Sequence, residues 1–251
     1  NFSQLVAGDL DRDGIPEVVT YRIGGQDLLI IDGKTGETER RIPTATTFEG
    51  GSSLALGDVD GDAWGEIIAI GEDGHLLAYE FDGTLKYRSP QAVGYRRQDR
   101  LSGISLADFD CNGTVEINVG TQIYEGAPGA LLAEGSDVLS RGRSCNNCAT
   151  GFVVAIDALP DYYCPSCGGL EIVAGNQVLA VDLVTGDLSV AAQAAAPLGD
   201  GFTSTADFDG DGDLDGIVMS SENDRWLCYV WDLQTPEIIR GPYFSNASSI
   251  D

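Results

Sequence analysis

The chain has 251 residues, 43% of them hydrophobic, and carries 40 acidic against 14 basic side chains, which gives a formal net charge of -26. This charge argues against nucleic-acid binding, which needs Lys and Arg to neutralise phosphates, and against docking on an anionic membrane surface. The composition is globular, and no apolar run approaches the roughly 20 residues of a membrane helix, so we expect no membrane insertion.

The first predicted element is a short strand that ends near Gly8. An acidic segment, residues 9–17, follows it and leads into a β-branched run at 17–21. The same order of strand, acidic segment and strand recurs at 58–66, 108–116 and 207–215. Counted from the first Asp, positions 1, 3 and 5 are Asp or Asn and position 9 is Glu or Asp, while position 6 is Gly except for Ala63.

This spacing indicates a loop that holds a hard cation. Calcium takes 6 to 8 oxygen ligands, and a tight loop can direct alternate side chains, together with the carbonyl of position 7, at one centre. Asp and Gly also mark ordinary surface turns, but four segments in one register favour the metal reading. The predicted ligands of about four Ca²⁺ ions are Asp9, Asp11, Asp13, Ile15, Glu17, Asp58, Asp60, Asp62, Trp64, Glu66, Asp108, Asp110, Asn112, Thr114, Glu116, Asp207, Asp209, Asp211, Asp213 and Asp215.

The segments are not EF-hands. That motif needs a bidentate Glu at position 12, where this chain has Thr20, Ala69, Val119 and Val218. Strand-forming residues also follow each segment, in place of the second helix of an EF-hand.

The acidic segments begin at residues 9, 58, 108 and 207, so a repeat of about 50 residues has lost one acidic segment near 157. Strand patterns at 152–157 and 170–175 flank that place, and a longer insertion replaces the acidic residues, so we expect no calcium there. The second half of each repeat reads as a strand, a Gly-containing turn and another strand. Four strands in about 50 residues are typical of a propeller blade.

The predicted fold is therefore an all-β propeller of four-stranded blades in a single domain. Five units are visible, at about 1–49, 50–99, 100–148, 149–198 and 199–246. Residues 243–251 either begin a sixth unit or close the ring. A closed five-bladed ring and a part of a larger ring both remain open.

The acidic segments resemble the FG-GAP/VCBS repeats of calcium-binding β-propellers, and the resemblance covers essentially the whole chain. Similar repeats occur in integrin α-subunit headpieces, in secreted bacterial surface proteins, and in some polysaccharide lyases and lectins. The resemblance implies that positions 1, 3, 5, 7 and 9 bind the ion. Ala63 at position 6 and Asn112 at position 5 depart from the family pattern.

Two Cys-x-x-Cys pairs, Cys145 with Cys148 and Cys164 with Cys167, flank the predicted strand at 151–157. The spacing is formally that of a zinc site. Seven strand residues span about 23 Å, however, which places the pairs at opposite ends of the strand and argues against zinc. We expect a short disulfide within each pair, in an extracellular or cell-surface setting, with the periplasm as an alternative.

The predicted function is a secreted, calcium-stabilised module for adhesion, binding or structure. Its expected partners are an extracellular protein, a glycan or other subunits of a surface assembly. The alternative is a polysaccharide lyase on the same scaffold, but two Lys and one His leave little for that chemistry, so we expect no enzyme. Trp226 and Trp231 lie on predicted strands, and we expect strand aromatics to pack between units.

Overall fold

The computed structural model describes residues 4–48, 52–93, 103–136, 139–140, 142, 151–160, 169–195, 198–222 and 225–246. Within these ranges the secondary structure is entirely strand and turn. The described residues contain no helix with the length and hydropathy needed to cross a bilayer.

The described strands form five consecutive antiparallel meanders of four strands, here called units 1 to 5. Unit 1 comprises β1 (Leu5–Gly8), β2 (Glu17–Tyr21), β3 (Gly25–Asp32) and β4 (Thr38–Phe48). Unit 2 comprises β5 (Leu54–Gly57), β6 (Glu66–Ile70), β7 (Leu76–Tyr79) and β8 (Leu85–Arg88). Unit 3 comprises β9 (Ile104–Ala107), β10 (Glu116–Val119), β11 (Gln122–Tyr124) and β12 (Leu131–Gly135). Unit 4 comprises β13 (Val154–Ile156), β14 (Glu171–Ala174), β15 (Gln177–Asp182) and β16 (Asp187–Gln193). Unit 5 comprises β17 (Phe202–Ala206), β18 (Asp215–Glu222), β19 (Arg225–Asp232) and β20 (Ile238–Asn246).

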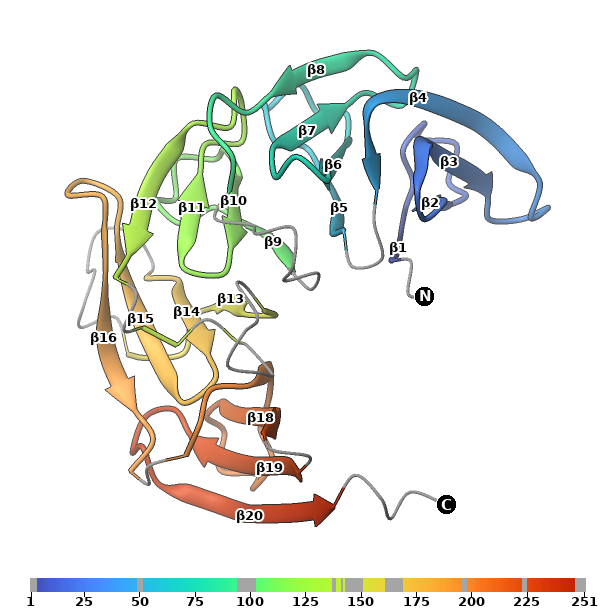
Figure 1. Ribbon diagram of the computed structural model, residues 1–251. Coiled ribbons are helices and arrows are strands. Elements are labelled where there is room, and N and C mark those ends of the chain that lie inside the picture. The colour runs from blue at the N-terminus through green and yellow to red at the C-terminus, as the bar shows by residue number, and fades with distance from the viewer. Residues whose placement is uncertain are drawn as a thin grey trace.

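The units follow one another around an arc, with the first strand of each unit towards the inside (Figure 1). These first strands contact one another in sequence, β1 with β5, β5 with β9, β9 with β13 and β13 with β17. The outer strands β12 and β16 pair in parallel, Glu134 with Asp187 and Gly135 with Leu188, which joins units 3 and 4 into one eight-stranded sheet. A gap separates the described strands of unit 1 from those of unit 5 in Figure 1, so the described residues do not form a closed ring.

Residues 243–246, which the sequence suggests as the start of a sixth unit or as a closing segment, form the end of β20. Tyr243 pairs with Cys228 and Asn246 pairs with Arg225 of β19. They are therefore the last residues of the outer strand of unit 5, and the remainder of the 243–251 segment lies outside the described residues.

The hydrophobic core is divided into four clusters, one between each pair of consecutive units. Strand β6 shows how one strand serves two of them. Ile67 and Ala69 pack in the cluster shared with unit 1, while Ile68 and Ile70 pack in the cluster shared with unit 3. Successive side chains of a strand point to opposite faces of the sheet, so a continuous apolar run fits a sheet that is covered on both sides.

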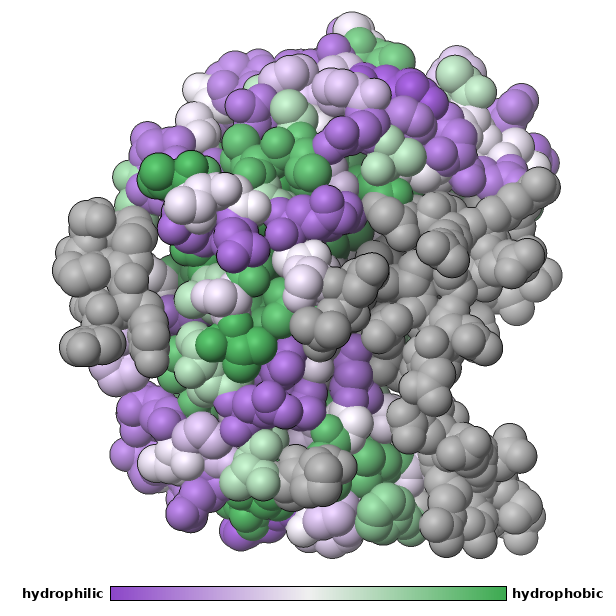
Figure 2. Space-filling model, turned by 60° about the vertical axis from the view of Figure 1, so that its left-hand side comes forward, coloured by the Kyte–Doolittle hydropathy of each residue, from purple (hydrophilic) through white to green (hydrophobic). Residues whose placement is uncertain are grey.

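Burial along the second strands reflects this stacking. Every residue of β6, β10 and β14 is buried, whereas β2 alternates between buried and half-buried positions. Units 2, 3 and 4 are therefore covered on both faces, and unit 1 on one face. The outer surface in Figure 2 carries many hydrophilic side chains, with hydrophobic side chains gathered between them.

Candidate metal centre

The four acidic loops occupy one place in the fold, the connection from the first to the second strand of units 1, 2, 3 and 5. The Asp at position 1 follows the last residue of the first strand, and the acid at position 9 is the first residue of the second strand. Antiparallel pairing across the loop, such as Gly8 with Glu17 in unit 1, brings these two ends together. The strands thereby fold each run of nine residues onto itself.

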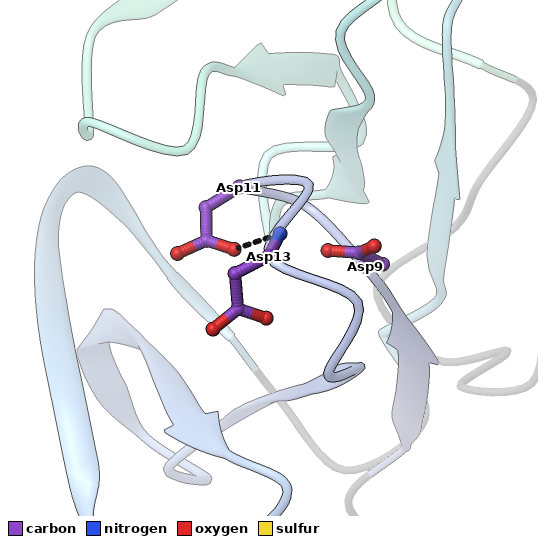
Figure 3. Close-up of side chains that lie close together, drawn as sticks. All are labelled: Asp9, Asp11 and Asp13. Atoms are coloured by element: carbon purple, nitrogen blue, oxygen red, sulfur yellow. Dashed lines mark hydrogen bonds between the residues drawn. The ribbon is translucent and has the colours of Figure 1, made fainter.

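Each loop gathers carboxylate oxygens that lie within 4.8 Å of one another, a spacing at which they can share one ion. Figure 3 shows Asp9, Asp11 and Asp13 of unit 1 turned towards a common centre. Together with that trio, the groups are Asp58, Asp60 and Asp62; Asp62, Glu66 and Glu80; Asp108, Asp110 and Glu116; and Asp207, Asp209 and Asp215. Carboxylates this close repel one another unless a cation or protons neutralise them.

Backbone N–H groups hold each loop in the same shape. The position-1 carboxylate accepts a hydrogen bond from the position-6 N–H in all four loops, at 3.1 Å for Asp9, 2.8 Å for Asp58, 2.9 Å for Asp108 and 3.2 Å for Asp207. The side chain of position 3 accepts from the N–H of position 5, as Asp11 does from Asp13 (Figure 3). The side chain of position 5 accepts from the N–H of position 7, and its partners in the four loops are Ile15, Trp64, Thr114 and Asp213.

Positions 4 and 6 have a left-handed backbone in all four loops. Position 6 has a φ of 88° at Gly14, 73° at Ala63, 88° at Gly113 and 101° at Gly212. A side chain at Gly14, Gly113 or Gly212 would meet no heavy atom within 4 Å, so the backbone conformation alone favours glycine there. Position 4 is Gly61 and Gly210 in two loops, and Arg12 and Cys111 in the others, with φ of 63° and 55°.

Ala63→Gly is therefore expected to stabilise the protein by about 0.5–1 kcal/mol, because an L-residue is strained in this region and glycine is not. Chemical denaturation measures the change. Ala180→Gly in β15, which pairs with Ser189 in a regular stretch of the β15–β16 pairing, is the control and should destabilise. A loss of stability from Ala63→Gly would contradict the assignment of strain.

The acid at position 9 is a buried anchor of the loop. Its carboxylate accepts a hydrogen bond from the position-2 N–H, at 2.7 Å from Leu10 to Glu17, 2.9 Å from Val59 to Glu66, 2.8 Å from Phe109 to Glu116 and 2.7 Å from Phe208 to Asp215. Burial raises the pKa of Glu66 and Asp215, and raises that of Glu116 to about 7. A nearby cation would favour the ionised form of each group.

Unit 4 keeps the anchor and lacks the acidic loop. Glu171, the first residue of β14, accepts hydrogen bonds from the N–H groups of Ala158 at 3.0 Å and Leu159 at 3.2 Å. No carboxylate group of the kind found in the other units is present among the described residues of unit 4. The insertion that contains Cys164 and Cys167, and the pair Cys145 and Cys148, lie outside the described residues, so the predicted disulfides stay predictions.

Two residues that lie at the second acidic loop were not predicted from the sequence. Lys86 of β8 and Glu80, which follows β7, both lie at the second acidic loop, where Lys86 Nζ is 2.7 Å from Glu80 Oε1 and 3.0 Å from Glu66 Oε1. Glu80 and Lys86 stand 14 and 20 residues beyond Glu66, outside the repeating acidic pattern. Only the pairing of β6, β7 and β8 brings them to the loop.

The three Trp residues differ in burial. Trp231 is fully buried, as expected for a strand aromatic, whereas Trp226 is 38% exposed, so the expectation that it packs between units is wrong. Trp64 at loop position 7 is 45% exposed, and the Arg12 guanidinium of the first loop stacks on its ring at 4.6 Å from the centroid. The first and second acidic loops are therefore in contact.

No protein-family model matches this chain, and neither does any curated protein sequence. Among solved structures, the V. cholerae biofilm matrix protein Bap1 is similar over 98% of this chain, with a TM-score of 0.62 and 16% identity. BBS1N, solved in complex with ARL6DN, is similar over 97% of this chain, with a TM-score of 0.52 and 12% identity. A rhamnogalacturonan lyase of Bacillus licheniformis matches over 93% of the chain and 60% of its own, with 15% identity and a TM-score of 0.42, which is too low to support an inference.

These similarities show the fold alone. A shared fold does not determine function. The chain spans 39% of the Bap1 chain and 66% of the BBS1N chain.

Proposed function

We propose that this chain is a calcium-stabilised β-propeller, or a part of one, that acts as an adhesion, binding or structural module of a secreted surface or matrix protein. The observation that carries the proposal is the shared geometry of the acidic loops. Four loops separated along the chain fold to the same hydrogen-bonded shape and bring carboxylate oxygens within 4.8 Å of one another. Their resemblance to FG-GAP/VCBS loops supports the same assignment.

Calcium suits these loops better than the other common metals. The candidate side-chain donors are all oxygens, which hard cations prefer over the nitrogen and sulfur ligands of zinc. Flexible carboxylates at irregular angles suit Ca²⁺, whereas Mg²⁺ requires near-ideal octahedral geometry and keeps several waters. We therefore assign calcium to the loops of units 1, 3 and 5, and treat unit 2 separately below.

A surface or matrix role is supported by three features together. Calcium sites of low affinity fill outside cells, where the ion reaches millimolar concentrations. A net charge of -26 keeps a protein soluble and suppresses binding to anionic polymers. One protein of similar fold, Bap1, is a biofilm matrix protein. The proposed partners are therefore neutral or basic: a neutral glycan, an extracellular protein or another subunit of an assembly.

An array of extracellular polysaccharides and matrix proteins, probed with the purified chain, tests this function. We expect binding in calcium that is lost in EDTA and restored when calcium is added back. The variant Asp9→Ala/Asp108→Ala/Asp207→Ala, which removes position 1 from three loops, should lose this binding. Calcium-independent binding, or no binding to any member of the array by folded protein, would contradict the proposal. Release of unsaturated uronate products from a polysaccharide would favour the lyase alternative.

A further inference from the structure

The fourth strand of four units carries a bulge close to the acidic loop. The pairing of the third strand with the fourth slips by one residue, which leaves one residue of the fourth strand without an opposite partner. The residues at this place are Glu39 in unit 1, Lys86 in unit 2, Leu132 in unit 3 and Ile239 in unit 5. The bulges therefore place an acid in unit 1, a base in unit 2 and an apolar residue in each of units 3 and 5 at equivalent positions.

In unit 2 the side chain at this position reaches the acidic loop. Lys86 Nζ contacts four carboxylates of unit 2, which belong to Asp60, Asp62, Glu66 and Glu80.

Within the loop, Lys86 contacts the second oxygen of each carboxylate, while the first oxygen accepts a hydrogen bond from a backbone N–H group of the loop. Oδ1 of Asp60 accepts the N–H of Asp62, and Oδ1 of Asp62 accepts the N–H of Trp64, while Lys86 Nζ lies against Oδ2 of both residues. Glu66 divides its oxygens in the same way: Oε2 accepts the N–H of Val59, and Oε1 lies 3.0 Å from Nζ. The ammonium group is well enclosed, since the Lys86 side chain is 19% exposed.

We propose that Lys86 is a built-in cation of the second acidic loop, and that this loop binds no calcium ion while Lys86 is present. The inference rests on the proposed calcium sites of the other loops and specifies which loops take the ion. A calcium ion in unit 2 would need the Oδ2 atoms of Asp60 and Asp62 that the ammonium holds. It would also be repelled by the positive charge of the ammonium group beside it.

The number of bound calcium ions tests this inference, measured by equilibrium dialysis against buffered calcium and metal analysis of the protein. Lys86→Leu places in unit 2 the residue that unit 3 has at Leu132, and should bind one ion more than the unsubstituted protein. Lys86→Gln, which keeps a polar side chain, should show the same gain if Lys86→Leu folds poorly. Lys34→Leu is the matched control: Lys34 is the chain's other lysine and is exposed in a turn, so the ion count should not change.

Thermal unfolding supplies a second readout. In EDTA, Lys86→Leu should melt below the unsubstituted protein, because its carboxylates have lost their counter-charge, and calcium should raise its melting temperature by more than it raises that of the unsubstituted protein. Equal, non-zero ion counts for the two proteins would overturn the inference and leave the proposed function intact. Calcium bound to neither protein would contradict the proposed function, and with it the idea that Lys86 replaces an ion.

Discussion

Trp231→Ala is expected to lower the free energy of unfolding by about 3–5 kcal/mol, the cost of removing a large aromatic side chain from a packed core. Trp231 is fully buried in the cluster between units 4 and 5. Its indole Nε1 donates a hydrogen bond to the carbonyl of Gly175 in unit 4 at 3.2 Å. The indole also lies over Gly216, where an added side chain would approach Nε1 to 2.8 Å.

Trp226→Ala is the matched control for this prediction, because it removes the same side chain from the same strand, β19, at a 38% exposed position. We expect a loss of less than about 1 kcal/mol there. Urea unfolding followed by circular dichroism measures both variants. Equal losses would contradict the view that packing between consecutive units stabilises the fold.

Glu171→Ala is expected to destabilise the protein by about 2–4 kcal/mol, because it leaves the buried N–H groups of Ala158 and Leu159 without their acceptor. Glu171→Gln keeps an acceptor oxygen and should cost less than half as much. Since unit 4 lacks the acidic loop, the loss should be the same in EDTA and in calcium. Differential scanning calorimetry in both buffers measures it.

Glu116→Ala is the comparison for Glu171→Ala, since Glu116 holds the equivalent place in unit 3 and lies in a carboxylate group with Asp108 and Asp110. Its loss should be larger in calcium than in EDTA, because the anchor and an ion ligand are removed together. We assign a structural role to Glu171 and a structural and metal-binding role to Glu116. A stability loss that depends more strongly on calcium for Glu171→Ala than for Glu116→Ala would contradict this assignment.

The strands and the acidic loops could be predicted from the sequence because each of them consists of consecutive residues. A period of about 50 residues predicted the units, and the first, second and third strands lie where the apolar runs indicated, as β6 and β7 illustrate. The carboxylates of positions 1 and 3 gather in all four loops, joined by position 5 in units 1 and 2 and by position 9 in units 3 and 5. Burial of Trp231 between units was also predicted correctly, whereas Trp226 is more exposed than predicted.

Features that depend on contacts between distant residues could not be predicted in this way. Lys86 reaches the second loop from a bulge in β8. The repeat pattern of the sequence indicates neither the position of this bulge nor the loop that its side chain contacts. The sequence showed that Ala63 replaces the usual Gly at position 6. It did not show the left-handed backbone that strains an alanine there. The parallel pairing of β12 with β16 likewise joins residues more than 50 positions apart.

Thermal unfolding in EDTA, in calcium and in magnesium tests the central claim, that calcium bound to the acidic loops stabilises the fold, most directly. A single site filled at 100 times its Kd adds about 2.7 kcal/mol, which corresponds to roughly 5–10 °C in a protein of this size. We therefore predict that calcium raises the Tm by more than about 5 °C over EDTA, that magnesium raises it less, and that Asp9→Ala, Asp108→Ala and Asp207→Ala each reduce the calcium effect. The same Tm in EDTA and in saturating calcium would contradict the account, and the acidic loops would then be polar turns.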